Sequence, residues 1–148
     1  MAWQNLALYL PPFLDGLAGW GLLLLRVIWG TIIVLYGVPM VKNPLHWLDL
    51  GGKPSGVPGF LQAIGAFTIF MGGIAIIAGL LTPLAALGLA GAMAFALWLH
   101  LKNGNPLIKQ PPDAAGDSYE ASLVYLAIAL LFLFVGPGNF SIDSILFR

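Results

Sequence analysis

Hydrophobic residues along this 148-residue chain gather into four long runs, and polar residues lie almost entirely between them. The runs cover residues 17–38, 60–81, 83–101 and 119–135. A transmembrane helix needs about 20 mostly apolar residues, and the fourth run would extend roughly 25 Å across a hydrocarbon core of about 30 Å. The pattern predicts an all-α, polytopic membrane protein: a four-helix transmembrane bundle with short interfacial segments, forming a single domain over residues 1–148.

The connection between the second and third runs is short, whereas the other two connections are long and polar. Only Thr82 separates the second run from the third, and Pro83 follows at a first helical position, where its missing N–H costs nothing. Thr82 is therefore expected to cap the third helix. Segments 39–59 and 102–118 form the long connections, and both are expected on one side of the membrane because an even number of crossings separates them.

Basic residues are divided unequally between the two ends of the predicted bundle. The opposite end carries only Arg148, whereas the two long loops carry Lys42, Lys53, Lys102 and Lys109. Cytoplasmic loops of membrane proteins are enriched in Lys and Arg. The count predicts cytoplasmic long loops and both termini outside.

Small residues recur at helical spacing within the first three runs, and such stripes let helix backbones approach closely in lipid. In the first run the stripe is Gly19, Arg26, Gly30 and Gly37. In the second run the glycines are Gly65, Gly72, Gly73 and Gly79. In the third run, where the stripe is expected to point inwards, it consists of Gly88, Ala92, Ala96 and His100. These stripes predict a compact bundle.

Composition narrows the chemistry. The chain is 59% hydrophobic and 8% charged, with a mean hydropathy of +0.93, against roughly 25% charged residues in soluble domains. Because its net charge is zero, it lacks the basic surface that a nucleic acid requires. The chain has no cysteine, so redox work would need a borrowed cofactor. A haem between His46 and His100 would require a loop to fold back over the bundle, and no metal site is predicted.

Arg26 is the tenth residue of a 22-residue span, too deep to reach the lipid headgroups easily. An arginine at a helix centre costs about 2.5–3.5 kcal/mol on insertion scales, so such residues usually face the bundle interior and a partner. One interpretation is an arginine that ties helices together through backbone carbonyls or one carboxylate. The other is a ligand contact, because five N–H donors in a fixed fork suit a quinone or carboxylate oxygen.

Three further polar residues are expected at the loop end of the bundle. His100 lies near the end of the third span, and Glu120 lies at the start of the fourth. Tyr36 lies near the end of the first span, about 15 Å from Arg26 by the helical rise. Each has a simpler interpretation as a satisfied interface residue. Together they are candidates for ligand binding or proton relay.

The last segment, GPGNFSIDSILFR, interrupts the fourth span at Gly136, Pro137 and Gly138. Ser141 is expected to cap a short helix, with Asp143 in its first turn. Apolar residues of this segment suit the membrane interface. The segment can therefore be explained as the end of the fourth span followed by an interfacial anchor, with no catalytic role.

These pieces together resemble the DoxX family of small four-helix membrane proteins. The matching stretches lie in order between residues 22 and 146: LLLLRVIWG, then GAFTIFMGGIAIIAGLLTPLAALGLAGAMAFALWLHLKNG, then Tyr119–Glu120, then GPGNFSIDSIL. By position, the family's recurrent polar sites correspond to Arg26, His100, Glu120, Ser141 and Asp143, beside the paired glycines Gly72 and Gly73.

The resemblance implies membrane redox work, with two departures. The family takes its name from a subunit linked to quinone-dependent oxidation of sulfur compounds, and other members are implicated in redox or assembly complexes. It often has histidine where this chain has Tyr36, and glutamate where this chain has Ile69. An acid and a histidine are thus missing from the expected interior, which weakens the case for proton-coupled chemistry.

Two functions remain open. One is a subunit of a quinone-linked respiratory or photosynthetic membrane complex, in which Arg26 would hold a quinone oxygen and His100 with Glu120 would pass protons. The other is a non-catalytic accessory or assembly subunit that stabilises a larger complex. Transport of small solutes is disfavoured, because four unbroken helices leave little room for alternating access. The expected partners are membrane lipids and either other subunits or further copies of the chain, in a bacterial inner or internal membrane.

Overall fold

The computed structural model describes residues 13–49, 53–113 and 115–147, and the fold there is entirely helical, as predicted. The helices are α2 (Gly16–Lys42), α3 (Gly59–Ala78), α4 (Thr82–Lys102), α5 (Glu120–Val135) and α6 (Ile142–Phe147). The first three are long and apolar enough to cross a membrane, whereas α5 has 16 residues. Large apolar side chains are exposed on the outside of all four long helices, among them Leu24, Ile64, Leu84 and Phe134. Such a surface suits lipid and not water.

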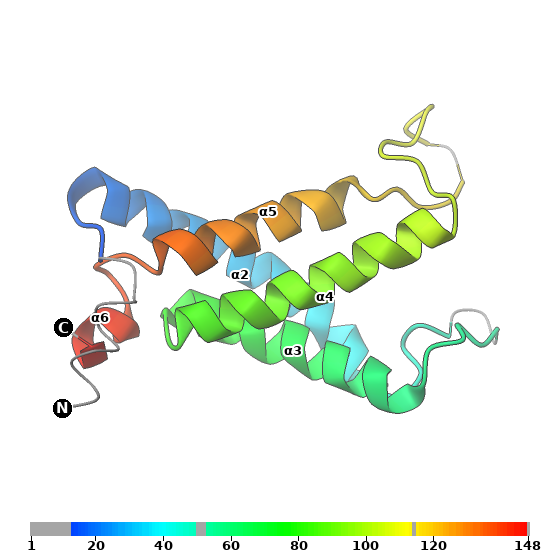
Figure 1. Ribbon diagram of the computed structural model, residues 1–148, viewed down its shortest axis with the longest axis horizontal. Helices are drawn as coiled ribbons and strands as arrows, with labels where there is room; N and C mark the ends of the chain where they lie inside the picture. The colour runs from blue at the N-terminus through cyan, green and yellow to red at the C-terminus, as the bar shows by residue number, and fades with distance from the viewer. Residues whose placement is uncertain (1–12, 50–52, 114, 148) are drawn as a thin grey trace.

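The four long helices form one bundle with two distinct ends (Figure 1). The two long loops lie at one end, called here the loop end, while α6 and the short α3–α4 turn lie at the other, called the hairpin end. Helix α3 packs between α2 and α4, and α5 packs on α4. Two aromatic pairs join α2 to α5: Trp29 stacks on Phe132 with ring centroids 5.7 Å apart, and Tyr36 meets Tyr125 edge-on at 6.3 Å.

Glycines bring α2 and α3 into close contact. A Cβ added to Gly37 would lie 2.8 Å from the Cα of Phe70, and one added to Gly73 would lie 3.0 Å from the backbone N of Val34. No larger side chain fits at either position without moving a backbone. The stripe predicted in the first span is confirmed, since all four of its members are buried: Gly19, Arg26, Gly30 and Gly37.

The stripe predicted to face inwards on the third span is wrong. The buried face of α4 consists of Thr82, Ala86, Leu89, Ala90 and Met93. By contrast, the residues of the stripe are only partly buried: Gly88, Ala92, Ala96 and His100. The physical reason is that the centre of the bundle must be filled by side chains with volume, whereas Gly88 and Ala92 border the space between α3 and α4.

Two helix boundaries also differ from the prediction. Pro39 does not end α2, which continues to Lys42 with the proline in its last turn. Helix α3 ends at Ala78, before the predicted residue 81. Gly79 adopts a left-handed φ of +66° there, and the Leu80 N–H donates to the Ala75 carbonyl at 3.0 Å, which closes the helix in a Schellman turn.

Candidate functional site

Arg26 is the most deeply buried charged residue that the structure describes, with 1% of its surface exposed. Its guanidinium donates four hydrogen bonds, all to backbone carbonyls. Nε donates to Ile76 at 2.9 Å and Nη2 to Ile77 at 2.8 Å. Nη1 donates to Pro137 at 3.2 Å and to Phe140 at 2.6 Å.

Two of these carbonyls belong to the C-terminal end of α3, and the other two belong to the segment between α5 and α6. Ile76 and Ile77 lie in the last turn of α3, and Pro137 and Phe140 lie in the segment that follows α5. The last carbonyls of a helix have no intrahelical N–H partner, and the macrodipole concentrates partial negative charge there. The guanidinium of Arg26 opposes that charge at the end of α3, and it also binds two carbonyls of the segment after α5. Arg26 therefore ties α2 to α3 and to the segment after α5.

Asp143 performs the complementary task at the start of α4. Its two carboxylate oxygens accept hydrogen bonds from the Leu81 N–H at 2.6 Å and from the Thr82 N–H at 2.7 Å. The Asp143 N–H in turn donates to the Gly79 carbonyl at 2.8 Å. A carboxylate opposes the positive end of a helix dipole. Asp143, which is also the carboxylate that attracts Arg26, caps α4 from a segment about 60 residues further along the chain.

The prediction that Thr82 caps α4 is therefore wrong. Thr82 is already helical, the residue before it is Leu81 in a left-handed conformation with φ of 47°, and no side chain of the turn itself caps the helix. The Thr82 hydroxyl is fully buried and has no hydrogen-bond partner among the described residues. With only three residues between α3 and α4, the turn is too tight for a local cap, and the carboxylate of Asp143 supplies it instead.

Small and turn-forming residues make room for this contact. A Cβ added to Gly79 would lie 2.7 Å from Nη2 of Arg26 and 2.5 Å from Cβ of Ser141, so no other residue fits there. Gly136 and Gly138 adopt φ values of +82° and +84° on either side of the buried Pro137. We call the set formed by Arg26, Gly79, Ser141, Asp143 and the carbonyls that they bind the hairpin-end network.

Ser141 connects this network to α6. Its hydroxyl donates to the Gly138 carbonyl at 2.7 Å and accepts a hydrogen bond from the Ser144 N–H at 3.2 Å. The second contact is the predicted cap of the short helix. Asp143 lies in the first turn of α6, as expected, but it is buried and serves α4.

The three loop-end candidates are not joined in one cluster. Tyr36 is half-exposed beside Tyr125. His100 is partly buried, with Nδ1 2.8 Å from the amide nitrogen of Asn105. Glu120 is exposed at the start of α5, and no hydrogen bond within the described part of the chain connects these three residues. The structure thus places them at the predicted end, but among the described residues no hydrogen bond joins them into the chain that a proton relay would use.

A second polar cluster at the loop end escaped the sequence interpretation. Gln62, with 2% of its surface exposed, accepts a hydrogen bond from the Leu48 N–H at 2.9 Å and donates to the Val57 carbonyl at 3.0 Å. The Trp47 indole N–H donates to the Gln62 carbonyl at 2.6 Å. A lone glutamine in the first turn of an apolar helix is the signal that could have revealed it.

Asp49 completes this loop-end network, which we define as His46, Asp49, Ser55 and Gln62. Its carboxylate accepts from the Ser55 N–H at 2.8 Å and from the Gln62 amide at 3.3 Å, and it lies 3.0 Å from Nδ1 of His46. The hydrogen bond from the Ser55 backbone, followed by that from His46, lowers the pKa of Asp49 well below its usual value. Asp49 therefore stays ionised in mildly acidic solution.

The described residues do not fit a quinone head at Arg26. A guanidinium has five N–H donors, and backbone carbonyls already receive four hydrogen bonds from this one. Only one N–H, on Nη2, remains beyond these four contacts, and it lies beside Gly79 on a side chain with 1% of its surface exposed, so a quinone oxygen could reach it only by opening the packed hairpin end. Nor do residues 13–49, 53–113 and 115–147 contain a group of three His, Asp or Glu placed to hold a metal ion.

Comparison with known proteins gives one match. Neither the curated proteins nor the solved structures include one that matches this chain. The family model described as DoxX matches residues 21–101, more than half of the chain. The matched region contains Arg26, the close α2–α3 contact and the α3–α4 turn. The chain is thus an integral membrane protein and belongs to the DoxX family.

Proposed function

We propose that this protein is a non-catalytic structural subunit of a quinone-linked redox complex in the membrane. The observation that carries the proposal is the internal use of Arg26. Its hydrogen bonds end on carbonyls of the same chain, and its electrostatic partner is Asp143 of the same chain. A guanidinium whose hydrogen bonds are used in this way stabilises the fold and has few N–H donors left for a substrate.

The arrangement at the loop end supports the same proposal. A proton path needs groups within hydrogen-bond reach of one another or of shared water. Here His100 is paired with Asn105, Tyr36 is packed beside Tyr125, and Glu120 is exposed. The association with redox complexes itself rests on what the DoxX resemblance implies, and the chemistry would belong to the partner subunits.

Purification from native membranes in a mild detergent tests this proposal. An affinity tag on the full chain is expected to bring down a larger complex, and deletion of the chain is expected to reduce the amount of that complex. Arg26→Gln should lower the amount assembled, with turnover per assembled complex unchanged. Arg26→Lys, which keeps the charge but has only three donors, should be intermediate.

Two outcomes would contradict the proposal. One is a chain that purifies alone while every larger complex survives its deletion. The other is an Arg26→Gln complex that assembles in normal amount but turns over slowly and has lost extractable quinone, because Arg26 would then contact the quinone directly. A matched substitution at an exposed position of α2, Thr31→Gln, serves as the control for handling losses.

A further inference from the structure

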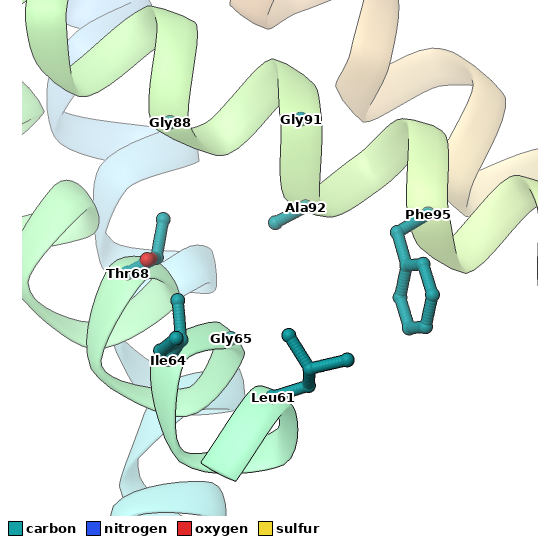
Figure 2. Close-up of a pocket in the computed structure, with 8 residues that line it drawn as sticks. All are labelled: Leu61, Ile64, Gly65, Thr68, Gly88, Gly91, Ala92 and Phe95. Atoms are coloured by element: carbon teal, nitrogen blue, oxygen red, sulfur yellow. The ribbon is translucent and has the colours of Figure 1, made fainter. Parts of the chain in front are cut away.

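An apolar groove runs along the outside of the bundle between α3 and α4. Its volume is about 290 Å³, and its lining includes Leu61, Gly65 and Thr68 of α3 with Gly91, Ala92 and Phe95 of α4. Figure 2 shows the side chains of Leu61, Thr68, Ala92 and Phe95 bordering the space between the two helices. Both helices cross the membrane, so the groove faces lipid.

The packing of the bundle does not require two of the three glycines of this groove, whereas a Cβ at the third, Gly88, would lie 3.2 Å from Cγ2 of Thr68. A Cβ at Gly91 would meet nothing within 4 Å, and one at Gly65 would meet only the Trp47 ring at 3.6 Å, an ordinary contact. This differs from Gly37 and Gly73, where a Cβ would strike a neighbouring backbone. The hollow therefore exists because glycine leaves room outside the bundle, and a larger side chain would fill it without disturbing the helix contacts.

A positive charge lies beyond one end of the groove. Phe95 lines the groove and stacks on Trp98 with ring centroids 5.7 Å apart, and the Lys102 ammonium lies 5.0 Å from the centroid of the Trp98 ring. Positions 95, 98 and 102 share one face of a helix. Trp98 and Lys102 are exposed in the last turns of α4, at the loop end. Tryptophan and lysine near a helix end are typical of the headgroup level of a bilayer.

We propose that this groove binds one acyl chain of an anionic phospholipid whose headgroup phosphate is held by Lys102. An apolar channel within the membrane that leads to a single cation at the headgroup level matches such a lipid in both shape and charge. The volume is just below the roughly 300 Å³ at which small-ligand pockets begin, which leaves room for part of one chain.

Native mass spectrometry of the delipidated full chain tests this proposal. The protein is titrated with phosphatidylglycerol and, separately, with phosphatidylcholine of the same acyl chains. The unmodified chain is expected to bind phosphatidylglycerol more tightly. Lys102→Gln should weaken phosphatidylglycerol binding about fivefold and remove the preference, because one cation near a membrane surface contributes about that factor.

Gly91→Leu tests the groove itself and should weaken binding of both lipids. Gly21→Leu is its matched control, because a Cβ at Gly21 of α2 also meets nothing within 4 Å.

Equal affinity of the unmodified chain for the two lipids would overturn the proposal, and so would lipid binding by Gly91→Leu equal to that of the control. If Gly91→Leu instead dissociated a dimer, the groove would belong to a second copy of the chain. If Gly91→Leu failed to fold, Lys102→Gln would still decide the matter, because that side chain is exposed.

Discussion

Polar side chains satisfy backbone groups at both the hairpin end and the loop end of the bundle, but with different chemistry. At the hairpin end a buried guanidinium and a buried carboxylate bind groups 50 to 114 residues away along the chain. At the loop end the central group is the neutral amide of Gln62. The groups that this amide binds lie between 5 and 14 residues away along the chain. The first network joins α2, α3, α4 and α6, whereas the second fastens one loop to the start of α3.

The comparison shows why a charged side chain, and not a neutral one, binds the backbone carbonyls in the membrane interior. A neutral amide is sufficient near water, where exchange with solvent limits the loss if a contact fails. In the interior, a full charge strengthens each hydrogen bond to a carbonyl, and the opposite charge of Asp143 offsets part of its burial. We therefore expect the two networks to differ in how far the effect of a mutation spreads.

The largest effect is expected for Arg26→Met. This change removes four hydrogen bonds and leaves the carboxylate of Asp143 without its opposite charge. A buried polar group left without its hydrogen-bond partner costs about 1–3 kcal/mol, and this change leaves several carbonyls in that state. The measurement is the free energy of unfolding in detergent micelles, followed by circular dichroism. A loss below about 1 kcal/mol would mean that the network does not hold the helices together.

Asp143→Asn is expected to have the next largest effect. The asparagine amide would turn a donor towards either the Leu81 or the Thr82 N–H, which are donors themselves. Loss of a cap costs about 0.5–2 kcal/mol. In the double variant with Arg26→Met, the two losses should sum to more than the measured total, because both changes disrupt one network. Strict additivity would show that Arg26 and Asp143 act independently.

Gln62→Leu is expected to act locally. It removes the acceptor for the Leu48 N–H and the donor to the Val57 carbonyl, at a cost of about 1–2 kcal/mol. Limited proteolysis should show faster cleavage between residues 43 and 58, with the hairpin end unaffected. The control is Asn103→Leu, a change of an exposed amide in the other long loop. If cleavage appeared at the hairpin end instead, the two networks would be coupled.

Acidification should produce the smallest effect, again at the loop end. The native pKa of Asp49 lies below the ordinary value of 3.8, so its contribution to stability is fully present above pH 3.8 and is lost as the pH falls through the native pKa. Proteolysis of the loop by an acid protease should therefore accelerate below about pH 3.8. Asp49→Asn should remove this acceleration. A transition unchanged in Asp49→Asn would assign it to another carboxyl group.

Most of the architecture could be predicted from the sequence. The runs that became α2, α3, α4 and α5 are visible in the hydrophobic pattern, and the glycine stripe of α2 predicts its buried face. The buried face of α4 could not be predicted in this way. In lipid, small residues mark a face that another helix or a lipid can approach closely, whether or not that face is buried in the same chain. On α4 the small residues Gly88, Gly91 and Ala92 border the groove.

The sequence by itself determined that the chain forms four apolar helices, three of them long enough to cross a membrane, and that Arg26 lies on a face turned towards other helices. Hydrophobicity and helical periodicity are properties of single segments, so they can be seen without a fold. Only the tertiary structure decided what Arg26 and Asp143 bind. Their partners are backbone carbonyls and N–H groups, which nearly every residue carries, and only the packing of helices distant in the chain selects among them.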